Sequence, residues 1–231
     1  LKPGGHLFID GDEPLLAEVE AEKIGYQIGN TYRIETTEAT FFGTAFAYDG
    51  TAFHLPVLGK HQVRNAAYAI ATARALGVTD AQIQEGFDAV ELTPMRMERL
   101  LYEETAVIND AYNASPTSMN AAIETITALE GYTTRVLVLG DMYELGEQER
   151  LLHASVGKRI ALPVSHAILV GEKGAWIAEG ISDPSVQVQF AATVEDAAKQ
   201  LRPMLGERTI VLLKASRGMA LERILTYLNE N

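Results

Sequence analysis

The chain has 231 residues, of which 47% are hydrophobic, so it has apolar material for one large or two small domains and disorder is not expected. Thirty-one acidic and nineteen basic residues give a net charge of −12, which argues against binding nucleic acid or an anionic membrane through bulk electrostatics. The absence of cysteine excludes disulfides and thiolate metal sites, and no apolar run approaches a membrane span. We therefore expect a cytoplasmic monomer with no nucleic-acid or membrane partner.

The first part of the chain is predicted to mix strands and helices. In order, we expect a strand at residues 6–10, an apolar-periodic helix from Pro14 through Lys23, strands at 32–37, 41–48 and 51–57, a helix at 61–76, and a helix from Thr79 to about Val90. Asp49-Gly50 separates the second and third of these later strands and is the strongest short hairpin signal a sequence offers, so this sheet has an antiparallel edge. A Thr-Pro turn then ends the helical signal, which places a boundary between domains 1–93 and 94–231.

The second part predicts an α/β fold with a doubly wound, mostly parallel sheet. A strand pair is expected at 100–102 and 106–108, and later apolar runs each precede an amphipathic segment of helical length: 135–139, 167–170, 186–190 and 209–213. The first helix opens on Ser115-Pro116, where Ser is a preferred cap and Pro is tolerated in the first turn.

Polar residues follow three of these strands. They are Asn109-Asp110, Gly140-Asp141 and the segment from Lys214 to Arg217. Carboxyl ends of parallel strands share one edge of a sheet, where open α/β folds bind ligands, so we predict a pocket for a polar ligand there. The alternative for Asp141 and Ser216 is that they only cap the helices that follow, and for either residue alone the two readings are about equally weighted.

A second candidate is the His61/Asn65 pair, which lies four residues apart on one face of a predicted helix. For an isolated pair of this kind, a solvated first turn with a capping role is the favoured alternative. The common phosphate-loop, dinucleotide, zinc-protease and nucleophile-elbow motifs are absent from the chain.

Four segments, following one another along the chain, resemble the Mur ligases. The segments are Gly59-Lys60-His61-Gln62-Val63-Arg64-Asn65-Ala66-Ala67, Asp110-Ala111-Tyr112-Asn113-Ala114-Ser115-Pro116-Thr117-Ser118-Met119, Val138-Leu139-Gly140-Asp141-Met142-Tyr143-Glu144-Leu145-Gly146 and Lys214-Ala215-Ser216-Arg217. The resemblance spans essentially the whole chain. It implies the last part of a mixed-sheet ATPase domain (1–93) followed by a Rossmann-like C-terminal domain (94–231).

The resemblance also implies roles for individual residues. The ATP-binding positions are His61 and Asn65 for adenine, Arg96 for the phosphates and Asp110 for the ribose hydroxyls. The positions for the incoming amino-acid substrate are Tyr112, Asn113, Lys214, Ser216 and Arg217. No catalytic residue and no metal ligand is assigned within the chain, because the resemblance places the phosphate loop and the ligands of Mg²⁺ before Leu1.

The activity implied is ATP-dependent amide-bond formation through an acyl phosphate in peptidoglycan precursor synthesis. The best match is the enzyme that adds D-alanyl-D-alanine to UDP-N-acetylmuramoyl-tripeptide, so the expected small-molecule partners are these two compounds and ATP. On this reading the chain is an incomplete fragment that is inactive alone. Two alternatives stay open: another Mur or folylpolyglutamate-type ligase, and a non-catalytic nucleotide-binding or interaction domain.

Overall fold

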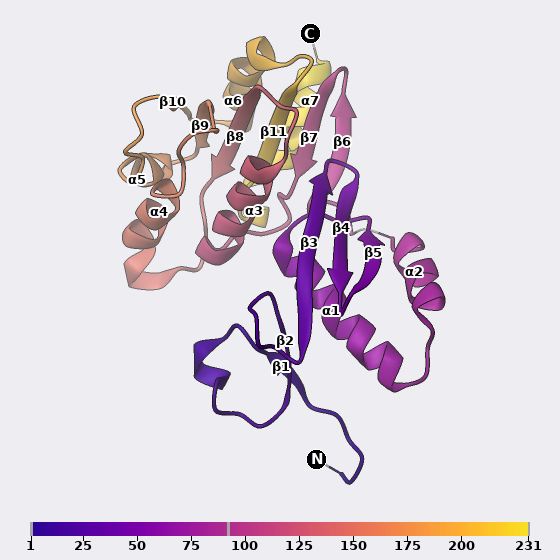
Figure 1. Ribbon diagram of the computed structural model, residues 1–231. Coiled ribbons are helices and arrows are strands. Elements are labelled where there is room, and N and C mark those ends of the chain that lie inside the picture. Colours follow the sequence, from indigo (N-terminus) through magenta and orange to yellow (C-terminus); the bar gives the residue numbers. More distant parts are fainter. Residues whose placement is uncertain (1, 92, 231) are drawn as a thin grey trace. The chain divides into compact units, whose positions relative to one another are not determined.

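The computed structural model describes residues 2–91 and 93–230 and divides the chain into two compact units, Leu1–Glu91 and Leu92–Asn231 (Figure 1). The predicted boundary between residues 93 and 94 lies two residues after this division. Three residues lie outside the described ones: Leu92, and the outer limits of the two predicted domains, Leu1 and Asn231.

The N-terminal unit holds a five-stranded mixed sheet in the order β1-β2-β3-β4-β5. Its strands are β1 (Phe8–Asp10), β2 (Glu22–Gly25), β3 (Tyr32–Thr40), β4 (Gly43–Tyr48) and β5 (Thr51–Leu55). The first three pair in parallel and the last three antiparallel. The Asp49-Gly50 hairpin is confirmed: Tyr48 pairs with Thr51, and both turn residues have positive φ (50° and 76°), as a tight two-residue turn requires.

Two helices, α1 (Lys60–Ala75) and α2 (Asp80–Asp88), complete this unit. Thr79 caps α2 through a capping box with Gln82, which confirms the predicted start. The buried face of α1 packs its small and branched side chains on the sheet, where they join Phe46, Phe53 and Phe87 in one apolar core.

The predicted helix from Pro14 through Lys23 is wrong. The structure has only one 3₁₀ turn, Pro14–Leu16, followed by β2. The apolar residues that produce the helical period in the sequence do not pack in a core: Leu15 is 89% exposed, and Val19 is also exposed. A short helix with no buried face gains little, whereas Glu22–Gly25 gains backbone pairing with β1 and β3.

The C-terminal unit holds a six-stranded sheet in the order β10-β9-β8-β11-β7-β6. Its strands are β6 (Glu98–Tyr102), β7 (Thr105–Asn109), β8 (Thr134–Gly140), β9 (His166–Val170), β10 (Gln187–Ala191) and β11 (Thr209–Lys214). All neighbours run parallel except the edge pair β6/β7. The prediction of a mostly parallel sheet in this unit is confirmed.

Helices cover both faces of this sheet (Figure 1). The α-helices are α3 (Pro116–Ala128), α4 (Glu149–Gly157), α5 (Gly174–Ala178), α6 (Val194–Leu201) and α7 (Ile224–Asn229), with 3₁₀ turns at Gly146–Gln148, Arg202–Met204, Arg217–Met219 and Leu221–Arg223. One face packs alternate strand residues such as Val136 and Val211 against α6 and α7. Helix α3 packs against β8 and β11 with Met119 and Ile126 fully buried. Within the described residues, no helix combines the length and apolar character needed to cross a membrane.

Candidate functional site

The carboxyl ends of β7, β8 and β11 meet at one edge of the C-terminal sheet. The three strands are parallel neighbours, with β11 in the middle, so the loops that leave them lie side by side. These loops surround a cavity of about 340 Å³, which we call the strand-end pocket. Its lining residues are Tyr112, Asn113, Tyr143, Glu144, Ser216, Arg217 and Gly218. The volume falls in the range of small-molecule sites.

A buried ion pair ties two of these loops together. Lys214, the last residue of β11, is 2% exposed, and its Nζ lies 2.5 Å from Asp110 Oδ2. The same ammonium donates to the carbonyl oxygens of Asn113 (3.0 Å) and Asp110 (3.5 Å). All three N–H directions are thereby used within the chain. Lys214 therefore holds the Asp110–Asn113 loop in place and is not among the residues that line the pocket. Its contact with the substrate stays a prediction.

The turn that leads into β6 positions Arg96. Its flanking residues Met95 and Met97 both have left-handed backbones, with φ of 58° and 52°. The Met97 N–H donates to Asp110 Oδ1 (3.0 Å), and the Tyr112 N–H donates to the Met95 carbonyl (3.1 Å). The Arg96 guanidinium then lies 4.2 Å from the centre of the Tyr112 ring in a cation–π contact. Arg96, Asp110 and Tyr112 are thus brought together, as their assignment to one site requires.

The loop after β8 forms another wall of the pocket. The Met142 N–H donates to Nε2 of His153, and His153 Nδ1 lies 2.7 Å from the Glu149 carbonyl, so this fully buried imidazole carries its proton on Nδ1. The next residue, Tyr143, donates its N–H to Ser216 Oγ at 2.8 Å. Gly218 lies against the Tyr143 ring, since a Cβ there would come within 2.9 Å of a ring carbon. The wall is therefore fixed to both α4 and the loop after β11.

Asp141 is buried behind this wall. Its Oδ1 accepts the Lys173 N–H (3.0 Å) just before α5, and its carbonyl accepts the Ser216 N–H (3.0 Å). Burial raises the pKa of Asp141, an effect that backbone hydrogen bonds and the nearby Lys173 only partly offset. Neither Asp141 nor Ser216 caps the helix that directly follows it, so the simple capping alternative fails for both side chains.

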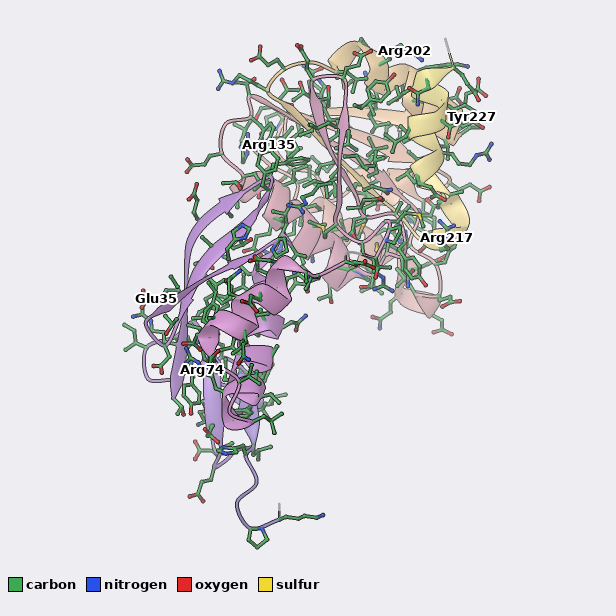
Figure 2. The ribbon with its side chains drawn as sticks, turned by 90° about the vertical axis from the view of Figure 1, so that its right-hand side faces the viewer. Glu35, Arg74, Arg135, Arg202, Arg217 and Tyr227 are labelled. Atoms are coloured by element: carbon green, nitrogen blue, oxygen red, sulfur yellow. The ribbon has the colours of Figure 1, made fainter. Side chains whose placement is uncertain are left out.

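Arg217 supplies a cation on the open side of the pocket. Its side chain is 55% exposed, and its Nη1 lies 2.7 Å from Glu222 Oε1 and 3.2 Å from Met95 Sδ. Figure 2 shows Arg217 toward the opposite end of α7 from Arg202, whose guanidinium donates to the carbonyls at the carboxyl end of that helix. Arg217 can therefore bind an anion without losing buried packing.

The two predicted adenine contacts lie in the N-terminal unit. His61 and Asn65 are exposed in the first two turns of α1, and Asn65 Nδ2 donates to Gln62 Oε1 (3.3 Å). The N-cap of α1 is Gly59, and no side chain provides the capping hydrogen bond, so the capping part of the alternative is not supported, whereas the exposure of both side chains agrees with a solvated first turn. Both residues keep their predicted role as a proposal.

The sequence reasoning missed Tyr143, Glu144 and Gly218 as pocket residues, although the first two directly follow Gly140-Asp141 at a strand end. That position was the available signal. In the described part of the chain, no group of three or more His, Asp or Glu side chains is arranged to hold a metal ion.

Comparison with known proteins gives consistent results. The family model "Mur ligase, glutamate ligase domain" matches residues 95–217. The chain is similar to the UDP-N-acetylmuramoyl-tripeptide–D-alanyl-D-alanine ligase of Bacillus subtilis, with 37% identity over all of this chain and 52% of that protein. Among solved structures it resembles MurF from Acinetobacter baumannii, with a TM-score of 0.77 and 27% identity over 92% of this chain and 47% of that one.

A further structural neighbour is the MurF ligase from Thermotoga maritima in complex with ADP. The TM-score is 0.79 and the sequence identity is 22%, over 96% of this chain and 52% of that one. At this identity the similarity supports the fold alone. The chain spans 52% of the length of the B. subtilis relative.

Proposed function

This chain belongs to the Mur ligase family, and we propose that it forms the part of a ligase that binds D-alanyl-D-alanine as the incoming amine and contributes contacts to ATP. The B. subtilis relative is named for this dipeptide-adding reaction. The observation that carries the proposal is the strand-end pocket, in which an exposed Arg217 stands over a cavity large enough for a dipeptide.

The chemistry divides between the substrates and the protein. The tripeptide carboxylate attacks the γ-phosphate of ATP, which gives an acyl phosphate and releases ADP. The dipeptide ammonium loses a proton, the resulting amine attacks the acyl carbon, and phosphate leaves as the amide forms. Because the reactive groups belong to the substrates, the protein's contribution is positioning and charge stabilisation. We assign the dipeptide carboxylate to Arg217, whose planar guanidinium can hold two oxygens at once.

The remaining pocket residues have supporting roles in this proposal. Tyr112 and Tyr143 provide ring surfaces, and Asn113 offers an amide for the peptide group of the substrate. Ser216 fixes the Tyr143 backbone, and Lys214 acts indirectly by holding the Asp110–Asn113 loop.

ATP contacts are proposed for each unit separately. In the N-terminal unit, Asn65 and His61 are assigned to adenine, because a carboxamide complements the donor and acceptor on one edge of that base. In the C-terminal unit, Arg96 is assigned to the phosphates and Asp110 to the ribose. The Tyr112 ring and the Met97 N–H already hold these two side chains in position. Mg²⁺ is proposed to accompany ATP.

The test is a phosphate-release assay on a polypeptide that supplies the ATP-binding loop. We would join this chain to the N-terminal half of the B. subtilis relative, in place of the matching half. The proposal predicts release that requires ATP, UDP-N-acetylmuramoyl-tripeptide and D-alanyl-D-alanine together. Release stimulated by a single amino acid instead of the dipeptide would assign the chain to another ligase of the family. ATP binding without any amine-dependent release would favour a non-catalytic nucleotide-binding protein.

A further inference from the structure

The strand-end pocket presents one side chain of each charge. Arg217 follows β11 and Glu144 follows β8, so the two charges reach the cavity from different loops. Both residues are exposed. Arg217 is bound to Glu222 through one nitrogen, whereas the Glu144 carboxylate has no hydrogen-bond or ion-pair partner in the part of the chain that the structure describes. A carboxylate on a pocket wall without a partner in the chain is available to a ligand.

The backbone at Glu144 is in the left-handed region, with φ of 61°. A residue with a Cβ rarely adopts this conformation, which costs energy and which glycine takes more easily. The strain is maintained by the fixed residues just before it, since Met142 is bonded to His153 and Tyr143 to Ser216. The loop thus keeps an energetically unfavourable backbone at a residue that lines the pocket.

We infer that Glu144 binds the ammonium group of the incoming dipeptide while Arg217 binds its carboxylate. The inference rests on the proposed function and adds a second recognition point to the same site. D-Alanyl-D-alanine carries opposite charges at its two ends, and a pocket with Glu144 on one loop and Arg217 on another is complementary to both ends at once.

This arrangement also selects against acidic amino acids. An acceptor such as glutamate has one amine and two carboxylates. Bound with its α-carboxylate at Arg217, it would place a second negative charge in the pocket that contains Glu144, where like charges repel. Glu144 is therefore a specificity-determining residue that distinguishes a neutral dipeptide from an acidic acceptor.

The experiment uses calorimetric titration of D-alanyl-D-alanine into the wild-type chain, Glu144→Gln and the control Glu147→Gln. Glu147 is exposed in the neighbouring 3₁₀ turn and does not line the pocket, so its variant matches the change in net charge. Loss of a charge-assisted pair predicts a Kd roughly 10- to 100-fold higher for Glu144→Gln and an unchanged Kd for Glu147→Gln. N-acetyl-D-alanyl-D-alanine, which lacks the ammonium, should bind wild type and Glu144→Gln equally weakly.

The outcomes separate this inference from the function on which it rests. Wild-type affinity in Glu144→Gln, with the dipeptide still preferred over its acetylated form, overturns the role of Glu144 and leaves the dipeptide site standing. No dipeptide binding by the wild-type chain overturns the proposed function and this inference with it. If Glu144→Gln melts early, Glu144→Gly replaces it, because glycine removes the carboxylate and suits the positive φ.

Discussion

Replacing Lys214 by methionine should destabilise the C-terminal unit strongly. Methionine fills a similar volume, but it leaves the Asp110 carboxylate, itself mostly buried, with the Met97 N–H as its remaining donor. It also leaves the Asn113 carbonyl without the ammonium. Breaking a buried ion pair by removing one partner costs about 3 to 5 kcal/mol. Asp110 keeps some exposure, which favours the lower end, so we expect a loss of about 3 kcal/mol in the free energy of unfolding.

The assay is urea unfolding followed by the fluorescence of Trp176. This residue is the chain's single tryptophan and lies in α5, so its emission reports on the C-terminal unit. The control is Lys199→Met, which removes a cation from an exposed helical pair with Glu195 and should leave the midpoint unchanged. Adding Asp110→Asn to Lys214→Met should restore part of the loss, because the uncompensated buried charge is then removed.

The reasoning is refuted if Lys214→Met shifts the urea midpoint no more than Lys199→Met does. In that case the Lys214 ammonium is not committed to Asp110 and is free for its predicted contact with the substrate.

Three further predictions concern the pocket and its support. Because burial raises the pKa of Asp141, the folded state favours its neutral form. Ionisation as the pH rises above the ordinary value of 3.8 and through the raised pKa therefore costs stability, so wild type should lose stability relative to Asp141→Asn as the pH rises from 3.8; a constant difference in urea midpoint across that rise would contradict this. His153→Ala should lower the free energy of unfolding by about 2 to 4 kcal/mol in circular-dichroism melts, because it leaves a cavity and an unpaired Met142 N–H. His153→Gln can supply an acceptor to that N–H and should cost less stability; equal losses in the two variants would show that the hydrogen bond does not contribute. Arg217→Ala should weaken dipeptide binding by about 2 kcal/mol in calorimetry. It should lower Tm only slightly, since the Arg217 side chain is 55% exposed although its partner Glu222 is only 25% exposed; a clearly lowered Tm with unchanged affinity would make Arg217 structural.

The strands and turns that depend on local pattern could be predicted from the sequence. The continuous apolar runs of β8 and β11 are typical of strands buried on both faces, and the structure buries every residue of β11. Asp49-Gly50 and Ser115-Pro116 carry their own backbone preferences, and both act as predicted. In the structure, β8, β11 and β7 are neighbours, so the polar residues that follow these three strands lie at one edge of the sheet.

The pairing of individual side chains could not be predicted, because it depends on contacts between distant residues. Lys214 and Asp110 are 104 residues apart, and nothing in the spacing shows that the ammonium would be buried against that carboxylate. The same holds for the Tyr143 N–H, whose acceptor Ser216 lies 73 residues away. The helical period from Pro14 to Lys23 misled for a related reason, since a periodic pattern indicates a helix only where a core exists to bury it.

The most direct test of the dipeptide site is a nuclear magnetic resonance titration of D-alanyl-D-alanine into the isotope-labelled chain. The strand-end pocket lies within a single unit, so the chain alone contains every residue that lines it. We predict saturable shifts of backbone amide signals confined to residues 112–113, 143–144 and 216–218, and their absence in Arg217→Ala. Shifts centred elsewhere in the chain, or equal shifts in Arg217→Ala, would contradict the assignment of this pocket to the dipeptide.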